Sequence, residues 1–342
     1  MEKMIQRTIE KEDPVRSNYD FIEVSNEQRE LTARHILPYR EDIIADARSL
    51  REKVDRGLQK DVVTRKRLRD YGKVYPNGLC GEIRNAWLEQ LPRHLFDSSS
   101  AGFWQIRQFL RSGGLMSGFW GVDSGRYFQN AIQLGSSILD VANDTVDRSK
   151  EPVVFYDDYE TAPIKNLEDF ESFADIAELY WKDRIYPNTI FPYISPYCPL
   201  LVERELQGQG KTDKVGLFFP AHDMKFFRRK NANSVGVEGR RFESAHRFIF
   251  SSKYSHRKLP DSFFEEIVKN DFLKDVSQRY PHVFTLSGDP SLFEERFNHF
   301  YHEGEDIDSL VQEIQVMREI TELMNRRGPI AVYPKPLESY EI

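Results

Sequence analysis

The chain has 342 residues, a formal net charge of −7 and an aromatic content of 13%. This length suits one large domain or two ordinary ones, either of which can bury a substantial core. The negative charge disfavours nonspecific binding to DNA or RNA, because the field of the whole protein repels phosphate. Two cysteines are too few for a disulfide scaffold or a thiolate zinc cage, so we expect a soluble protein of the cytoplasm.

Residues 1–24 are polar and of mixed charge, and we expect a polar arm rather than a secretion signal or a membrane anchor. Ser25 begins a helix, because its spacing to Gln28 is that of a capping box. A second, amphipathic helix is predicted from Asp42 through Leu58, where apolar residues recur every three or four positions. No apolar stretch is long enough to span a bilayer as a helix, so no membrane partner is expected.

A short helix is predicted over residues 79–91, and Pro92 is expected to stop it. Alternating and β-branched apolar residues then predict two strands, over residues 131–143 and 152–158. Gly135, in the middle of the first of these stretches, is interpreted as a bulge.

Asn166 is expected to cap another helix, which buries Phe170 and Ala174. Four prolines interrupt residues 185–202, so this stretch is interpreted as a long crossover or as the rim of a cleft. Beyond it, apolar runs separated by polar loops predict three strands. These strands cover residues 214–219, 246–252 and 282–287.

Helices return near the end of the chain, over residues 290–301 and 308–327, and a final strand is predicted over residues 330–334. Helices at both ends, around strands that do not alternate with helices, indicate an α+β fold with a central, mainly antiparallel or mixed sheet. We expect residues 25–342 to form a single large domain, with any subdivision near residues 185–202.

Residues 101–147 contain seven of the 19 glycines. Glycine at this density indicates backbone at positive φ, or backbone that another group approaches closely. Phosphate-binding loops can have this composition, but the segment contains no lysine and neither nucleotide fingerprint, so no nucleotide cofactor is predicted. The segment is either a packed connection or the wall of a small-molecule pocket lined by Trp104, Trp120 and Tyr127.

The end of this segment carries four oxygen-bearing side chains, which would suit a hard cation such as Mg²⁺ or Ca²⁺. They are Asp140, Asn143, Asp144 and Asp147. Their spacing is not that of an EF-hand loop. A run of this kind more often forms Asx-type turns at the end of a strand, and both interpretations stay open at this point.

The predicted strand that begins at residue 214 is followed by His222 and Asp223, and a histidine beside a carboxylate can act as a base with its orienting group or as a metal pair. His246 begins the next predicted strand. Two histidines and one carboxylate hold Fe(II) in some oxygenases, although the usual motif leaves one residue between the first histidine and the carboxylate. The sequence thus offers His222, Asp223 and His246 as ligands of a divalent metal, Fe or Zn.

The loop between these two histidines reverses the sign of the chain's charge. It is rich in basic residues and includes Arg228, Arg240 and Arg241. Arginine binds carboxylate and phosphate through two parallel hydrogen bonds, so a small anionic substrate or a partner could bind here. The alternative is a solvent-exposed hairpin whose arginines pair with the acidic helix near residues 168–178.

Cys80 lies in the first turn of the helix predicted over residues 79–91. A helix N-terminus lowers the pKa of a thiol, and papain-type and transglutaminase-type enzymes use a cysteine in this position with a distant His and an Asp or Asn. Cys80 also lies on the apolar stripe of the helix, where a buried thiol would be inert. If the thiol reacts, its partner is His222, His246 or another histidine.

Three functions are therefore expected. The first is a metal-assisted enzyme that acts on a small anionic substrate, for instance an Fe-dependent oxygenase, with His222 and Asp223 in catalytic roles. The second is a Cys80-dependent hydrolase or acyltransferase. The third is a non-catalytic interaction protein, in which Phe226 and Phe227 bind a protein partner.

Overall fold

The computed structural model describes most of the first 205 residues and shorter stretches of the rest. The described ranges are 24–70, 72–96, 99–167, 169–196, 198–205, 214–218, 243–259, 289–302 and 331–334, with single positions at 265, 269, 271, 274, 278 and 287. The chain folds as two compact units, Met1–Leu167 and Glu168–Ile342. The boundary precedes residues 185–202, near which the sequence placed any subdivision, and the single domain expected over residues 25–342 stays a prediction.

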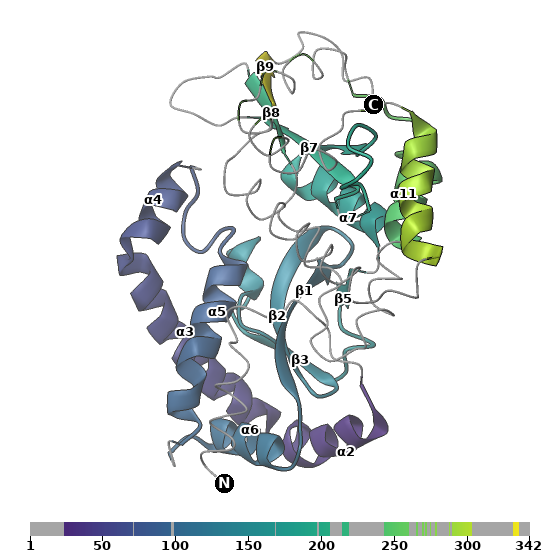
Figure 1. Ribbon diagram of the computed structural model, residues 1–342. Helices are drawn as coiled ribbons and strands as arrows, with labels where there is room; N and C mark the ends of the chain where they lie inside the picture. Colours follow the sequence, from purple (N-terminus) through teal and green to yellow (C-terminus); the bar gives the residue numbers. More distant parts are fainter. Residues whose placement is uncertain are drawn as a thin grey trace. The chain divides into compact units, whose positions relative to one another are not determined.

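The protein has an α+β fold, as the sequence predicts (Figure 1). In the first unit, five antiparallel strands form a sheet in the order β4-β3-β2-β1-β5. These strands are β1 Met116–Asp123, β2 Tyr127–Leu134, β3 Ser137–Asp140, β4 Val154–Tyr156 and β5 Ile164–Asn166. The α-helices that precede the sheet are α2 Asn26–His35, α3 Arg40–Lys60, α4 Val62–Asp70, α5 Cys80–His94 and α6 Ala101–Arg111.

The first two of these helices form where their sequence predicts them. Ser25 is the N-cap of α2, and its Oγ accepts a hydrogen bond from the N–H of Gln28 at 3.2 Å, which confirms the predicted cap. In α3 the apolar stripe of the predicted second helix is buried, as at Ile43 and Leu50. Capping and apolar periodicity therefore determine this part of the fold locally.

Two predictions for the middle of the first unit are wrong. Helix α5 continues through Pro92 to His94, because a proline this close to the end of a helix disturbs only the bonding of its last turns. Residues 131–143 are not one strand with a bulge, because β2 and β3 are separate strands that pair antiparallel. Gly135 has a φ of 57° and lies in the tight turn between them, where the left-handed conformation lets the chain reverse.

The glycine-rich segment begins with α6, a helix that the sequence analysis did not identify. Ser100 caps this helix, which packs on α3. Gly102 permits the contact, because a Cβ at this position would lie 2.5 Å from the backbone of Asp42. Gly113 and Gly125 have φ values of 94° and 66°. The segment therefore contains both features that its glycines led us to expect, which are backbone at positive φ and backbone that another segment approaches closely.

The second unit contains a four-stranded antiparallel sheet in the order β6-β7-β8-β9. Its strands are β6 Arg184–Pro187, β7 Leu200–Glu205, β8 Lys214–Phe218 and β9 Ala331–Pro334. The last two confirm the strands predicted over residues 214–219 and 330–334. Helix α11, Pro290–His302, confirms the helix predicted over residues 290–301.

The helix predicted to begin at Asn166 begins later. Asn166 is the last residue of β5, and Asp169 is the N-cap of α7, Phe170–Ile176. The side chain of Asp169 accepts a hydrogen bond from the N–H of Ser172 at 2.8 Å. The helix continues as a π-helix over Ala177–Trp181, the element η3.

Two further expectations for the second unit are corrected. Residues 246–252 do not form a strand, because residues 243–250 are helical; a short apolar run does not by itself distinguish a buried helix from a strand. The irregular crossover predicted over residues 185–202 is shorter than expected, since the two ends of this stretch belong to β6 and β7, which pair antiparallel. The strand predicted over 282–287, apart from its last residue, and the helix predicted over 308–327 lie outside the described residues.

The main core of the first unit lies between the helices and one face of the sheet. Helices α3, α5 and α6 lie on this face (Figure 1). Their buried side chains form one cluster with those of β2 and β3. A smaller cluster, which includes Phe119, Ala131 and Ile138, lies on the opposite face, because consecutive strand residues alternate between faces. Among the helices in the described part of the chain, none is both long enough and apolar enough to cross a membrane.

Candidate functional site

Cys80 is the first residue of α5 and follows a turn that begins at Tyr75. In this turn the N–H of Leu79 donates to the carbonyl of Pro76 at 3.1 Å, and Gly78 has a φ of 73°, which glycine adopts without steric cost. The first N–H groups of an α-helix have no partner within the helix, and those of α5 lie at the same helix end as the thiol. The structure thus confirms that Cys80 lies in the first turn of a helix.

The thiol of Cys80 meets strand β2. The side-chain N–H of Asn130 donates to Sγ at 3.2 Å, and Asn130 is only 7% exposed. Arg84, one helical turn after Cys80, is also buried, and its Nη1 donates to the carbonyl of Phe119 in β1 at 3.2 Å. Neither Asn130 nor Arg84 was expected from the sequence, although Arg84 lies four residues after Cys80 and therefore on the same side of the helix.

Burial raises the pKa of the Cys80 thiol above its ordinary value. The hydrogen bond from Asn130 and the positive charge of Arg84 act in the opposite direction, because both favour the thiolate, whereas the carboxyl of Asp140 acts with burial. The sequence led us to expect a lowered pKa at the helix N-terminus, and the desolvation of the sulfur outweighs that effect. A pKa above the ordinary value keeps the thiol protonated near neutral pH.

A buried carboxyl lies on the other side of β2. Gln129 precedes Asn130, and consecutive strand residues point to opposite faces of a sheet. Nε2 of Gln129 donates to Oδ2 of Asp140 at 2.7 Å, and the N–H of Ala142 donates to Oδ1 at 2.8 Å. Burial raises the pKa of the Asp140 carboxyl to about 7. Its bond to the N–H two residues ahead is an Asx-type turn, the second of the two interpretations left open for this segment.

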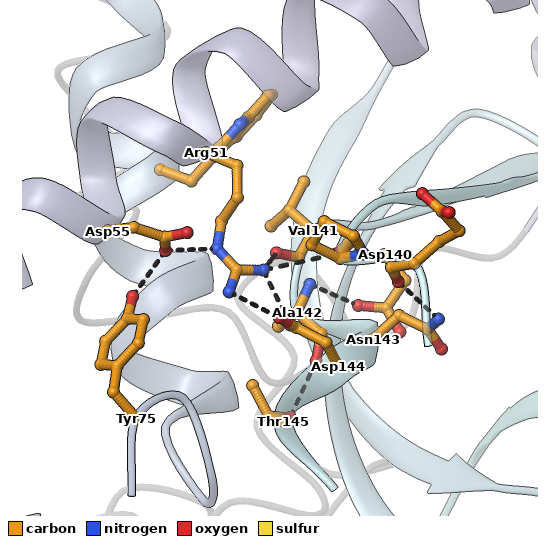
Figure 2. A network of polar contacts seen from close by, with 12 residues as sticks. Arg51, Asp55, Tyr75, Asp140, Val141, Ala142, Asn143, Asp144 and Thr145 are labelled. Atoms are coloured by element: carbon orange, nitrogen blue, oxygen red, sulfur yellow. Dashed lines mark hydrogen bonds and ion pairs between the residues drawn. The ribbon is translucent and has the colours of Figure 1, made fainter. Parts of the chain in front are cut away.

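A buried arginine from α3 holds the segment that follows Asp140. Figure 2 shows the guanidinium of Arg51 directed at this segment, where Nη1 donates to the carbonyl of Val141 at 2.6 Å. Nη1 and Nη2 also donate to the two carboxylate oxygens of Asp144, at 3.0 and 3.2 Å. Arg51 is 1% exposed. The signal that could have revealed it is its position, because Arg51 follows Ala47 by four residues on the apolar stripe of α3.

Asn77, three residues before Cys80, carries a buried acceptor that no described residue of the chain satisfies. Its Oδ1 is buried and has no hydrogen-bond partner among the residues that the structure describes. Buried acceptors in proteins nearly always have a partner. A donor on a bound molecule, such as the N–H of an amide, would satisfy this oxygen.

The three aromatic residues expected to line one pocket do not face one common surface. Trp104 is on α6 and is 39% exposed. Trp120 is buried in β1, directly opposite Asn130, so it faces α5. Tyr127 is three residues before Asn130 and points to the other face of the sheet, where its hydroxyl accepts a hydrogen bond from Nζ of Lys150 at 2.7 Å.

Most of the residues expected at the metal, anion and protein-partner sites lie outside the described residues: His222, Asp223, Phe226, Phe227, Arg228, Arg240 and Arg241. His246 is described, within the helix of residues 243–250 rather than at a strand end. Its ring contacts those of Phe250 and Phe297, at centroid distances of 4.7 and 5.4 Å. Within the described ranges, no group of three or more His, Cys, Asp or Glu residues is placed to hold a metal. The metal and anion sites stay predictions.

No protein-family model, curated protein or solved structure matches this chain. The candidate site consequently rests on side-chain geometry. The cluster around Cys80 is the strongest candidate, because a carboxamide from β2 donates to a thiol in the first turn of α5, and the charge of Arg84 favours the thiolate.

Proposed function

We propose that the protein is a thiol-dependent hydrolase or acyltransferase in which Cys80 is the nucleophile. The observation that supports this most directly is the hydrogen bond from Nδ2 of Asn130 to Sγ of Cys80, at 3.2 Å and at the first turn of α5. A thiolate that forms at this position keeps this donor, and the charge of Arg84 stabilises it further. Reactive cysteines in other enzymes are also found near a helix N-terminus and a positive charge.

In the proposed reaction, Sγ of Cys80 attacks the carbonyl carbon of an acyl donor, and the thiol proton ends on the leaving group. This step forms a thioester. Water or another acceptor then takes the acyl group and transfers its own proton to the sulfur. The N–H groups of the first turn of α5, together with the carboxamide of Asn130, would stabilise the oxyanion of each tetrahedral intermediate.

A histidine usually takes the proton of such a thiol, and here the residue beside Sγ is Asn130. His94 is at the opposite end of α5, about 21 Å from Cys80 at a rise of about 1.5 Å per residue. The sequence suggested His222 or His246 as the partner of the thiol, and this pairing stays a prediction, because His222 lies outside the described residues and His246 belongs to the second unit.

The unpaired side-chain oxygen of Asn77 supports the proposal that the acyl donor is an amide. The amide N–H of such a substrate would donate to the buried Oδ1, which has no partner in the described part of the chain. The small anionic substrate expected from the sequence stays part of this proposal, as does a reducing compartment such as the cytoplasm, in which a free thiol persists.

The test is acetylation of the purified protein by p-nitrophenyl acetate, followed by mass spectrometry of the intact chain and its peptides. We expect a burst of one p-nitrophenol per chain and a single acetyl group on Cys80. Cys80→Ala is expected to lose both. Cys198→Ala is the matched control and is expected to keep both, because Cys198 is 1% exposed and lies in the second unit.

Two outcomes would overturn the proposal. One is a burst that survives in Cys80→Ala, and the other is a wild-type protein that is acetylated only at other residues. Inhibitors separate this mechanism from metal-assisted chemistry. We expect iodoacetamide to abolish the burst and EDTA to leave it unchanged, whereas a metal-assisted reaction requires the opposite pattern.

A further inference from the structure

Arg51 places a positive charge in the core of the first unit, and every nitrogen of its guanidinium is used. Besides its bonds to Val141 and Asp144, its Nε donates to Oδ1 of Asp55 at 2.6 Å. Burial alone would lower the pKa of Arg51, but the hydrogen bonds with Asp55 and Asp144 raise it, so the side chain stays charged. A buried charge is tolerated only while its partners are in place, so these contacts restrict how the surrounding segments can move.

Two series of contacts start at Arg51 and are called its two branches. The first branch leads to the beginning of the turn before Cys80. The hydroxyl of Tyr75 donates to Oδ1 of Asp55 at 2.5 Å, next to the bond from Arg51 (Figure 2). Burial and the hydrogen bond to Asp55 raise the pKa of Tyr75, so the phenol keeps its proton and remains a donor. Tyr75 is therefore tied to α3 through Asp55.

The second branch leads to the end of the same turn. Asp144 belongs to a short 3-10 helix, η2, Asn143–Thr145. The carbonyl of Thr145 accepts a hydrogen bond from the N–H of Gly78 at 2.9 Å. Oγ1 of Thr145 donates to the carbonyl of Ala142 at 2.8 Å, which keeps η2 folded against the end of β3. Gly78, two residues before Cys80, is thus held by the segment that Arg51 binds.

We propose that Arg51 is a positioning residue for Cys80. Its guanidinium connects α3 to both ends of the turn that carries the thiol, at Tyr75 and at Gly78, and so sets where Sγ meets Asn130. Arg51 acts through this turn and not on the sulfur itself. The inference rests on the proposed function of Cys80, but it concerns the position of the thiol and can be tested without an acyl donor.

The experiment measures the rate at which iodoacetamide alkylates Cys80 as a function of pH, in the full chain carrying Cys198→Ala. Tyr75→Phe removes only the hydroxyl of the first branch, and Arg51→Lys keeps the charge without the planar set of donors. Burial is the main cause of the raised thiol pKa, so a released turn would expose the sulfur and lower the pH midpoint. A midpoint lower by about one unit raises the thiolate fraction near neutral pH about tenfold. We expect at least this change in alkylation rate for both variants.

Tyr254→Phe is the matched control, because the hydroxyl of Tyr254 in the second unit donates in the same way to Oδ1 of Asp175, at 2.7 Å. It is expected to keep the wild-type alkylation profile. Circular dichroism establishes which variants fold, and Tyr75→Phe decides the question if Arg51→Lys does not fold. A wild-type profile in folded Tyr75→Phe would overturn the inference. A shifted profile together with a failed acetylation test would support the positioning of Cys80 and overturn only the proposed function.

Discussion

Arg51 and Asp144 form a two-point ion pair inside the first unit, with Nη1 3.0 Å from Oδ1 and Nη2 3.2 Å from Oδ2. The two residues are 93 positions apart in the sequence, and their pair joins α3 to the segment after β3. Paired in this way, a guanidinium and a carboxylate fix each other's orientation as well as their distance. Removing Arg51 would leave a partly buried carboxylate without its cationic partner.

Arg51→Met is therefore expected to destabilise the first unit by about 3 kcal/mol, because Asp144 loses its cationic partner and Asp55 keeps only the hydroxyl of Tyr75. Arg48→Met is the control on the same helix. Arg48 is exposed and pairs with the exposed Glu151 at 3.0 Å, and such a pair contributes about 1 kcal/mol or less. Urea unfolding measures the free energy of unfolding of both variants. An equal decrease in the two variants would contradict the importance of the pair between Arg51 and Asp144.

The carboxyl of Asp140 makes stability depend on pH in a specific window. Its pKa is about 7 in the folded chain, through burial, against an ordinary value of 3.8. Between these values the folded state holds a proton that the unfolded state has released. The contribution of Asp140 to the free energy of unfolding is thus greatest below this window. It falls by about 1.4 kcal/mol per pH unit as the pH rises through the window, and it is constant above pH 7.

Asp140→Asn removes this dependence, because the amide does not titrate. We expect the free energy of unfolding of the wild type to decrease relative to that of Asp140→Asn as the pH rises towards 7. Denaturant unfolding at several pH values measures the difference between the two proteins. A difference that stays constant over this range would show that Asp140 ionises with an ordinary pKa in the folded protein.

Replacement by alanine is expected to lower the stability of the protein at Gly102 and to raise it at Gly57. A Cβ at Gly102 would lie 2.5 Å from the backbone of Asp42, so Gly102→Ala forces α6 and α3 apart and should cost about 1–3 kcal/mol. Gly57 lies in α3 with nothing within 4 Å of its Cβ position, so Gly57→Ala should add up to about 1 kcal/mol through helix propensity. Thermal unfolding midpoints separate the two, and a stable Gly102→Ala variant would be incompatible with the packing described.

The metal site expected at His222, Asp223 and His246 can be tested on freshly purified, untreated protein. This hypothesis predicts about one Fe or Zn per chain, since two histidines and a carboxylate form a common set of ligands. His222→Ala should lose the metal, whereas the control His256→Ala, which replaces an exposed histidine, should retain it. Metal analysis by mass spectrometry decides the matter, and a metal-free wild-type protein would count against this site.

Several elements could be predicted because their signals are local. Ser25 caps α2 through a residue three positions away, and the helix of residues 290–302 and the strand of residues 214–218 lie close to their predicted bounds. Helix capping and apolar periodicity depend on neighbours within one or two turns. Such neighbours are visible in the sequence without any tertiary contact.

Other predictions failed where distant segments decide the structure. Residues 246–252 have apolar residues in an order that suits a strand, yet residues 243–250 are helical. Gly135 could have been a bulge or a turn, and the pairing of β2 with β3 made it a turn. In both cases the local sequence permits two conformations, and packing against other elements selects one of them.

The sequence by itself determined that Cys80 would lie in the first turn of a helix, because turn and helix signals act within a few residues. Only the tertiary structure decided what surrounds the thiol. Asn130, its hydrogen-bond donor, is 50 positions away, and Arg51 meets the carbonyl of Val141 across 90 positions. Burial and hydrogen bonding set the pKa of a group and depend on which distant segments pack together, so no local pattern could have shown that this thiol is protonated at rest.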